Sequence, residues 1–85
     1  MDRTDGLNML NFAKAMFQRL ETKAEKYKNK EWTRMDLKEL RESLYQHEEE
    51  LGACLRRLDS PDRSENIKRE CLDIANYALF IYLRS

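Results

Sequence analysis

The chain has few of the residues that interrupt regular secondary structure. Its 85 residues include one proline and two glycines. The strict alternation of apolar and polar side chains that marks a half-buried strand is also absent. These absences argue against strands and predict an all-α protein built from long helices.

Excess charge of one sign and long apolar runs are absent too. The formal net charge is zero although 38% of the residues are charged, so nothing draws the chain generally toward nucleic acid or an anionic membrane. The longest apolar run, from Tyr77 to Leu83, is about a third of the roughly 20 residues that span a bilayer. The first five residues lack the features of a signal peptide. We therefore expect neither nucleic acid nor a membrane as partner.

Cysteine is scarce and its spacing is uninformative. The two cysteines, Cys54 and Cys71, form no C-x-x-C motif and do not suggest a disulfide framework. We interpret them as small reduced core residues rather than metal ligands, and they favour a reducing, cytoplasmic location.

The length predicts one domain, residues 1–85. A chain of this size buries a modest fraction of its surface and is marginally stable alone, so oligomerisation would stabilise it. The segment from Leu79 to Leu83 is apolar on every side, and a helix of that kind is buried on every side. We therefore expect a second subunit to cover it, in a dimer or a tetramer.

Three apolar stripes at spacings of three and four predict three main helices in an antiparallel bundle. The first follows Thr4 or Asp5 and fades in residues 28–31. The second begins at Thr33 as its cap, and the third begins with Ser60 as cap and Pro61 in the first turn, with Ser64 as a second possible cap. The stripes of the second and third helices each contain one polar intruder, His47 and Glu70 respectively; their apolar members include Leu37, Leu40, Leu44, Leu51, Cys54 and Leu58, then Ile67, Ile74, Tyr77 and Ile81.

The two intruders belong to the most informative feature of the chain. Each has an acidic neighbour one helical turn on, which gives His47-x-x-Glu50 and Glu70-x-x-Asp73. Glu50 and Glu70 lie equally far from residue 60, and so do His47 and Asp73. If the two helices fold back at the turn, all four side chains converge, and inward carboxylates on facing helices are a recurrent way to build a metal site. Carboxylates suit Mg²⁺ or Mn²⁺, and the imidazole shifts the balance toward Mn²⁺.

Simpler interpretations remain open for each intruder. His47 can be a core histidine hydrogen-bonded to a carboxylate such as Asp73, and Glu70 can lie at the surface beside Cys71. Glu48 and Glu49 can be solvated, although either can also reach the site as a base or an extra ligand.

The residues from Lys23 to Leu83 resemble the MazG-like, all-α nucleoside triphosphate pyrophosphohydrolases, which carry E-x-x-E on one helix and E-x-x-D on the next. The strongest stretch is residues 70–78, ECLDIANYA, which is similar to the E-x-x-D-[VI]-x-[ND]-[YF] segment of small phage and prokaryotic members. Upstream, the sequence Glu49-Glu50-Leu51 resembles the end of the family's glutamate-rich helix. The segment holding Lys28, Lys30 and Trp32 resembles one that precedes that helix in some members.

The resemblance implies an enzyme that cleaves a nucleoside triphosphate between the α and β phosphates, in a prokaryotic cell or a phage-infected host. It implies that Glu50, Glu70 and Asp73 are Mg²⁺ or Mn²⁺ ligands, with His47 in place of the family's first glutamate. Glu49 or Glu50 would be the catalytic base. Substrate contacts would come from Asn76, Lys28, Lys30 and Trp32, although the lysines can be solvated and Trp32 can instead be a core or interface anchor.

Three functions are therefore weighed for this chain. The first is a metal-dependent nucleoside triphosphate pyrophosphohydrolase that works as a homo-oligomer. The second is a protein on the same scaffold that binds a nucleotide or metal without hydrolysing it, which the replacement by His47 favours. The third is a structural helical oligomer with a buried network of His47, Glu70 and Asp73.

Overall fold

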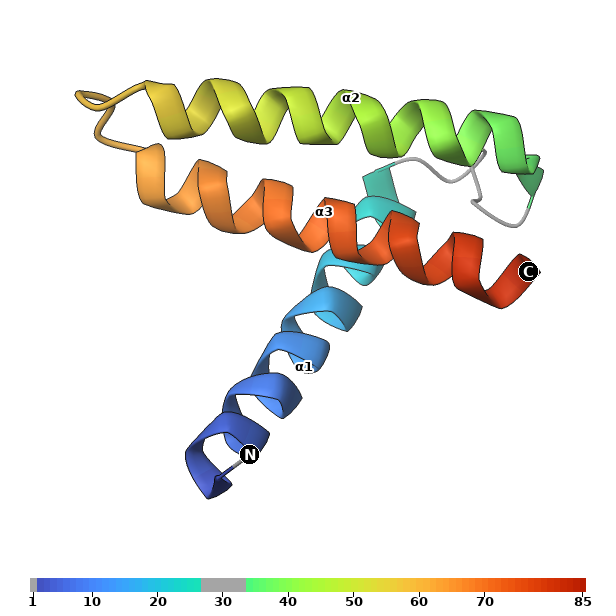
Figure 1. The fold of residues 1–85 in the computed structure, drawn as a ribbon, viewed down its shortest axis with the longest axis horizontal. Coiled ribbons are helices and arrows are strands. Elements are labelled where there is room, and N and C mark those ends of the chain that lie inside the picture. Colours follow the sequence, from blue (N-terminus) through green and yellow to red (C-terminus); the bar gives the residue numbers. More distant parts are fainter. Residues whose placement is uncertain (1, 27–33) are drawn as a thin grey trace.

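The computed structural model describes residues 2–26 and 34–85, and all the regular structure in these ranges is helical. The helices are α1 (Arg3–Lys26), α2 (Leu37–Arg56) and α3 (Arg63–Arg84). Figure 1 shows α2 and α3 side by side and antiparallel, joined by the turn around residue 60. The predicted all-α class is confirmed for the described residues. None of these helices is long and apolar enough to cross a membrane.

Helix α1 begins earlier than the sequence predicted. The backbone N–H of Asp5 donates to the Asp2 carboxylate at 2.9 Å, and the Asp2 N–H lies 3.4 Å from the Asp5 carboxylate. The two aspartates thereby satisfy each other's free amides in the manner of a capping box. The prediction of Thr4 or Asp5 as the cap is wrong because Asp2, one turn upstream, fills that position.

Helix α2 is capped by Asp36, whose carboxylate accepts a hydrogen bond from the Glu39 N–H at 2.8 Å. The predicted cap, Thr33, lies outside the described residues. An aspartate three residues before the capped amide has the geometry of a standard N-cap. The cap of the helix therefore lies three residues later than predicted.

The start of α3 also differs from the prediction. Asp62 is the N-cap residue, and its side chain makes no capping hydrogen bond. Ser60 instead accepts the Arg63 N–H through its backbone carbonyl at 3.2 Å, which places Ser60 and Pro61 in a turn before the helix. The cap predicted at Ser60, with Pro61 in the first turn, is therefore wrong.

Helix α1 does not lie along the hairpin of α2 and α3. It crosses α3 near the middle of that helix, and its N-terminal half points away from the hairpin (Figure 1). The predicted hairpin is present, whereas an antiparallel bundle of all three helices is not confirmed.

The buried interior of the described chain is small and unusually polar. Its buried apolar side chains are Leu40 and Phe80, and it also buries Glu70, Asp73 and Asn76 on one face of α3. Many large apolar side chains remain exposed in the single chain, among them Leu10, Phe17, Leu58, Tyr82 and Leu83. Cys54 and Cys71 are half-buried free thiols.

Candidate metal centre

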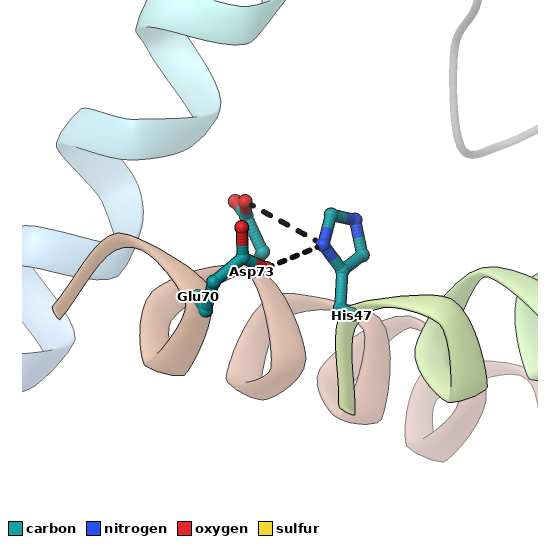
Figure 2. A group of neighbouring side chains, drawn as sticks. All are labelled: His47, Glu70 and Asp73. Atoms are coloured by element: carbon teal, nitrogen blue, oxygen red, sulfur yellow. Dashed lines mark hydrogen bonds and ion pairs between the residues drawn. The ribbon is translucent and has the colours of Figure 1, made fainter. Parts of the chain in front are cut away.

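Three side chains from the two hairpin helices converge at one point. His47 projects from α2 toward Glu70 and Asp73 of α3, as Figure 2 shows. One ligand atom from each residue can be chosen so that the three atoms lie within 4.8 Å of one another. We call His47, Glu70 and Asp73 the hairpin cluster. Three of the four side chains whose spacing about residue 60 predicted a common height on the hairpin therefore lie together.

The pairing within the cluster differs in detail from the predicted register. His47 Nδ1 lies 2.9 Å from Glu70 Oε2, 3.5 Å from Glu50 Oε2 and 3.8 Å from Asp73 Oδ2. His47 therefore lies between the two acidic residues of α3 rather than opposite Asp73 alone. Glu70 is 6% exposed, so the alternative that placed it at the surface is wrong.

The imidazole of His47 is held in place from two sides. Its ring stacks on the Tyr77 ring with centroids 5.2 Å apart, and Tyr77 meets Phe80 edge to face. An ionised carboxylate only accepts hydrogen bonds, so Nδ1 carries a proton when it bonds to ionised Glu70. A cation bound at Nδ1 would have to replace that proton.

Asp73 is neutralised by two cations from α1. Arg19 donates to Asp73 through Nε at 3.0 Å and through a terminal nitrogen at 3.3 Å, and Lys23 Nζ lies 3.0 Å from Asp73 Oδ1. Burial by itself raises the pKa of Asp73, but the hydrogen bonds and positive charges of Arg19 and Lys23 outweigh it and lower this pKa below its usual value. Asp73 therefore stays ionised although it is 3% exposed.

Arg19 and Lys23, which we call the basic pair, are the part of the site that sequence reasoning missed. They lie four residues apart and so share one face of α1. The available signal was the need of a buried carboxylate for a cation. The sequence gives no crossing angle between α1 and α3, so it could not say which basic residues supply that charge.

Asn76 lies one turn after Asp73 on the same face of α3 and is 3% exposed. Its amide nitrogen donates to the backbone carbonyl of Met16 at 3.2 Å, which fastens α1 to α3. Within the described part of the chain, its carbonyl oxygen Oδ1 is buried without a hydrogen-bond partner. A buried carbonyl without a partner is costly, so a donor or a cation supplied from outside would be stabilised there.

The donor set fits a divalent cation that accepts both oxygen and nitrogen. Ligand atoms about 2.1 to 2.5 Å from a shared ion are separated from each other by about 3 to 5 Å, which matches the spread of the hairpin cluster. Imidazole with two carboxylates suits Mn²⁺ better than Mg²⁺. Such an ion would compete with the basic pair for Asp73.

The other predicted site residues are not drawn into the cluster. Glu50 stands at its rim with a side chain 47% exposed, in contact with His47. Glu49 is exposed and lines a shallow hollow on α2 with Tyr45 and Glu48; its hydrogen bond with Tyr45 raises the pKa of that phenol. The predicted substrate residues Lys28, Lys30 and Trp32 lie outside the described residues.

Comparison with family models, curated proteins and solved structures finds no match to this chain.

Proposed function

We propose that the chain is a metal-dependent nucleoside triphosphate pyrophosphohydrolase with a MazG-like helical domain. It would add water across the bond between the α and β phosphates and release a nucleoside monophosphate and pyrophosphate. The observation that carries the proposal is the convergence of His47, Glu70 and Asp73 on one side of a helical hairpin. The resemblance of residues 70–78 to the E-x-x-D segment of that family supplies the class of reaction.

The residues of the site divide into ligands and partners of the substrate. His47, Glu70 and Asp73 would hold Mn²⁺ or Mg²⁺, with Glu50 as an additional ligand or as the base that takes a proton from water. When bound, such an ion polarises phosphoryl oxygens and makes a bound water more acidic. Asn76 and the predicted residues Lys28, Lys30 and Trp32 would contact the nucleotide. Glu49 is the second candidate for the base, although its exposed position beside Tyr45 favours Glu50.

A turnover assay tests this function. Each ribo- and deoxyribonucleoside triphosphate is incubated with the protein and Mn²⁺ or Mg²⁺, and monophosphate and pyrophosphate are separated by chromatography. We expect both products in equal amounts with Mn²⁺, and loss of turnover by at least a hundredfold in Glu70→Gln. Glu65→Gln, which removes an exposed carboxylate from the same helix, is the matched control and should keep full activity. The absence of product from every nucleotide would overturn the proposal.

A second candidate function is binding of a nucleotide or metal without hydrolysis. Two observations favour it: His47 stands where the family has a carboxylate, and the basic pair offsets two of the three carboxylate charges around the site. Less negative charge lowers the affinity for a second divalent ion. Saturable nucleotide binding in a calorimeter, without product, would select this function over the first.

We also propose that the working form is a homo-oligomer in the cytoplasm. Support comes from the exposed apolar side chains on α1 and at the end of α3, including Leu10, Phe17, Tyr82 and Leu83. Exposed apolar side chains in such number favour association.

A further inference from the structure

The basic pair carries more positive charge than the neutralisation of Asp73 requires. Two cations converge on one carboxylate, and both contact the same oxygen, Oδ1, at 3.0 Å. The side chains of Arg19 and Lys23 are still 25% and 27% exposed, so each reaches solvent while it holds Asp73. Lys23 Nζ also lies 5.8 Å from the centre of the Tyr77 ring, the ring that stacks on His47. Both cations thus stand at the edge of the hairpin cluster.

A divalent cation in the cluster and the basic pair cannot share Asp73 on equal terms. The carboxylate oxygen nearest His47, Oδ2, accepts a hydrogen bond from Arg19 at 3.3 Å. An ion on this carboxylate would lie within a few ångströms of both Arg19 and Lys23, and like charges at such distances repel strongly. Both side chains are long and partly solvated, so they can swing away without unfolding α1.

Phosphate is the chemistry that suits the released side chains. The guanidinium of Arg19 offers a planar fork that matches phosphate oxygens, and the ammonium of Lys23 offers a compact charge with three donors. Both lie on one face of α1, one helical turn apart, beside the carboxylates that would hold the ion. A metal-bound polyphosphate would therefore meet the two cations at the place where they leave Asp73.

We propose that Arg19 and Lys23 are the polyphosphate-binding residues of this site, held on Asp73 until a divalent cation takes that carboxylate. This inference rests on the proposed function for the kind of substrate. It adds that α1, rather than only the hairpin, supplies the substrate contacts. The two side chains exchange one anion, Asp73, for another, the polyphosphate.

Opposite changes in two affinities test the exchange. Mn²⁺ binding to the intact chain is measured by the loss of the electron paramagnetic resonance signal of free Mn²⁺. Binding of inorganic triphosphate is measured by calorimetry at constant free Mn²⁺. In Arg19→Gln and Lys23→Gln we expect Mn²⁺ to bind at least threefold more tightly, because a competitor for Asp73 is gone. We expect triphosphate to bind tenfold or more weakly. Lys14→Gln, which removes an exposed charge from the same helix, should change neither affinity.

Several outcomes would overturn the inference. They are no Mn²⁺ binding by the unaltered chain, unchanged triphosphate affinity in both variants, and a joint fall of both affinities. The last result would mean that the basic pair only fastens α1 to α3. Arg19→Lys and Lys23→Arg keep the charge and should retain most of the triphosphate affinity, which separates loss of contact from loss of fold.

A measurement on the unaltered protein keeps the test independent of variant folding. Lysine acylation is mapped by mass spectrometry in chelator, in Mg²⁺, and in Mg²⁺ with triphosphate. Lys23 should be acylated faster when Mg²⁺ is added and slower again with triphosphate, while Lys14 stays constant. An acylation rate of Lys23 that changes with neither addition would refute the exchange.

The outcomes also separate this inference from the proposed function. Opposite affinity changes without nucleotide hydrolysis would leave the exchange intact and remove the enzyme. Hydrolysis by the unaltered protein, with unchanged triphosphate affinity in Arg19→Gln and Lys23→Gln, would support the enzyme and refute the exchange.

Discussion

At the scale of single residues, Asp73 connects the stability of the chain to pH. Its folded pKa lies below the ordinary value of about 4 because Arg19 and Lys23 outweigh the cost of burial. Between the folded and unfolded pKa values the unfolded chain binds more protons, so stability rises with pH in that interval. The stabilising contribution is complete above about pH 4 and is lost as the pH falls through the lowered folded pKa.

Asp73→Asn should therefore destabilise the chain at neutral pH and matter little in strong acid. We expect a loss of about 2 kcal/mol in the free energy of unfolding at pH 7, because two charge-assisted interactions are removed. The difference between the two proteins should shrink as the pH is lowered from 4 toward 2. Urea unfolding followed by circular dichroism, in chelator, measures both quantities. A difference that does not depend on pH would contradict the assignment.

His47→Glu converts the cluster to the all-acidic pattern of the family that we propose for this chain. In chelator, the new carboxylate would face Glu70, which now lies 2.9 Å from His47, and like charges at this distance lower stability. With Mn²⁺ the added charge should tighten metal binding by about tenfold, or about 1.4 kcal/mol. In chelator, the melting temperature of His47→Glu should thus lie below that of the unaltered protein. Addition of Mn²⁺ should restore it. Gln46→Glu, an exposed neighbour that adds the same charge outside the cluster, should do neither.

The hairpin cluster could be predicted from the sequence because two rules fix it. Helical periodicity places His47 and Glu70 on the facing stripes, and a single turn near residue 60 sets their heights. The contact of Asp73 with Arg19 and Lys23 could not be predicted, because it depends on how α1 crosses α3. The orientation of Asn76 toward Met16 was missed for the same reason.

At the scale of the helices, the N-termini of α2 and α3 show that a capping residue must have the right backbone as well as the right side chain. Asp36 adopts an extended backbone and accepts the Glu39 N–H, whereas the Asp62 side chain accepts no such bond. The sequence offered two capping residues for α1, one for α2 and two for α3, and propensity alone did not identify the residues that the structure uses. Helix existence was predictable, but helix boundaries were not.

This contrast between two aspartates gives a matched test. Asp36→Ala should lower the free energy of unfolding by about 1 kcal/mol, since it removes a capping hydrogen bond. Asp62→Ala should have a smaller effect because no such bond is lost. Urea unfolding of the two variants at pH 7 compares them directly. Equal losses would show that the Asp36 carboxylate does not stabilise α2 through its cap.

At the scale of the whole molecule, the exposed apolar surface is large for a chain with so small a core. Leu40 and Phe80 are its buried apolar side chains among the described residues. On α1, Leu7, Leu10 and Ala13 line a hollow that is almost entirely apolar. Water contact with such a surface is unfavourable, and association of two copies would relieve it.

Association should therefore depend on this part of α1. We expect sedimentation to show a dimer or larger species that dissociates with dilution. Leu10→Gln should raise the dissociation constant of this species at least tenfold. Leu37→Gln, an exposed leucine on α2, serves as the control. A monomer at every concentration would show that the chain tolerates this apolar surface without a second copy.

The double attachment of Asp73 affects how inactive variants must be interpreted. This carboxylate both belongs to the hairpin cluster and fastens α1 through Arg19 and Lys23. Under the proposed function, an Asp73 variant that fails to turn over nucleotide has two explanations, the loss of an ion ligand and the loss of a docked helix. Among the described residues, Glu70 hydrogen-bonds to His47 of the hairpin and makes no hydrogen bond or ion pair with α1, so we expect Glu70→Gln to leave the attachment of α1 unchanged. A genetic screen that scores only activity would rank the two residues alike, whereas a screen that also scores protein abundance would separate them.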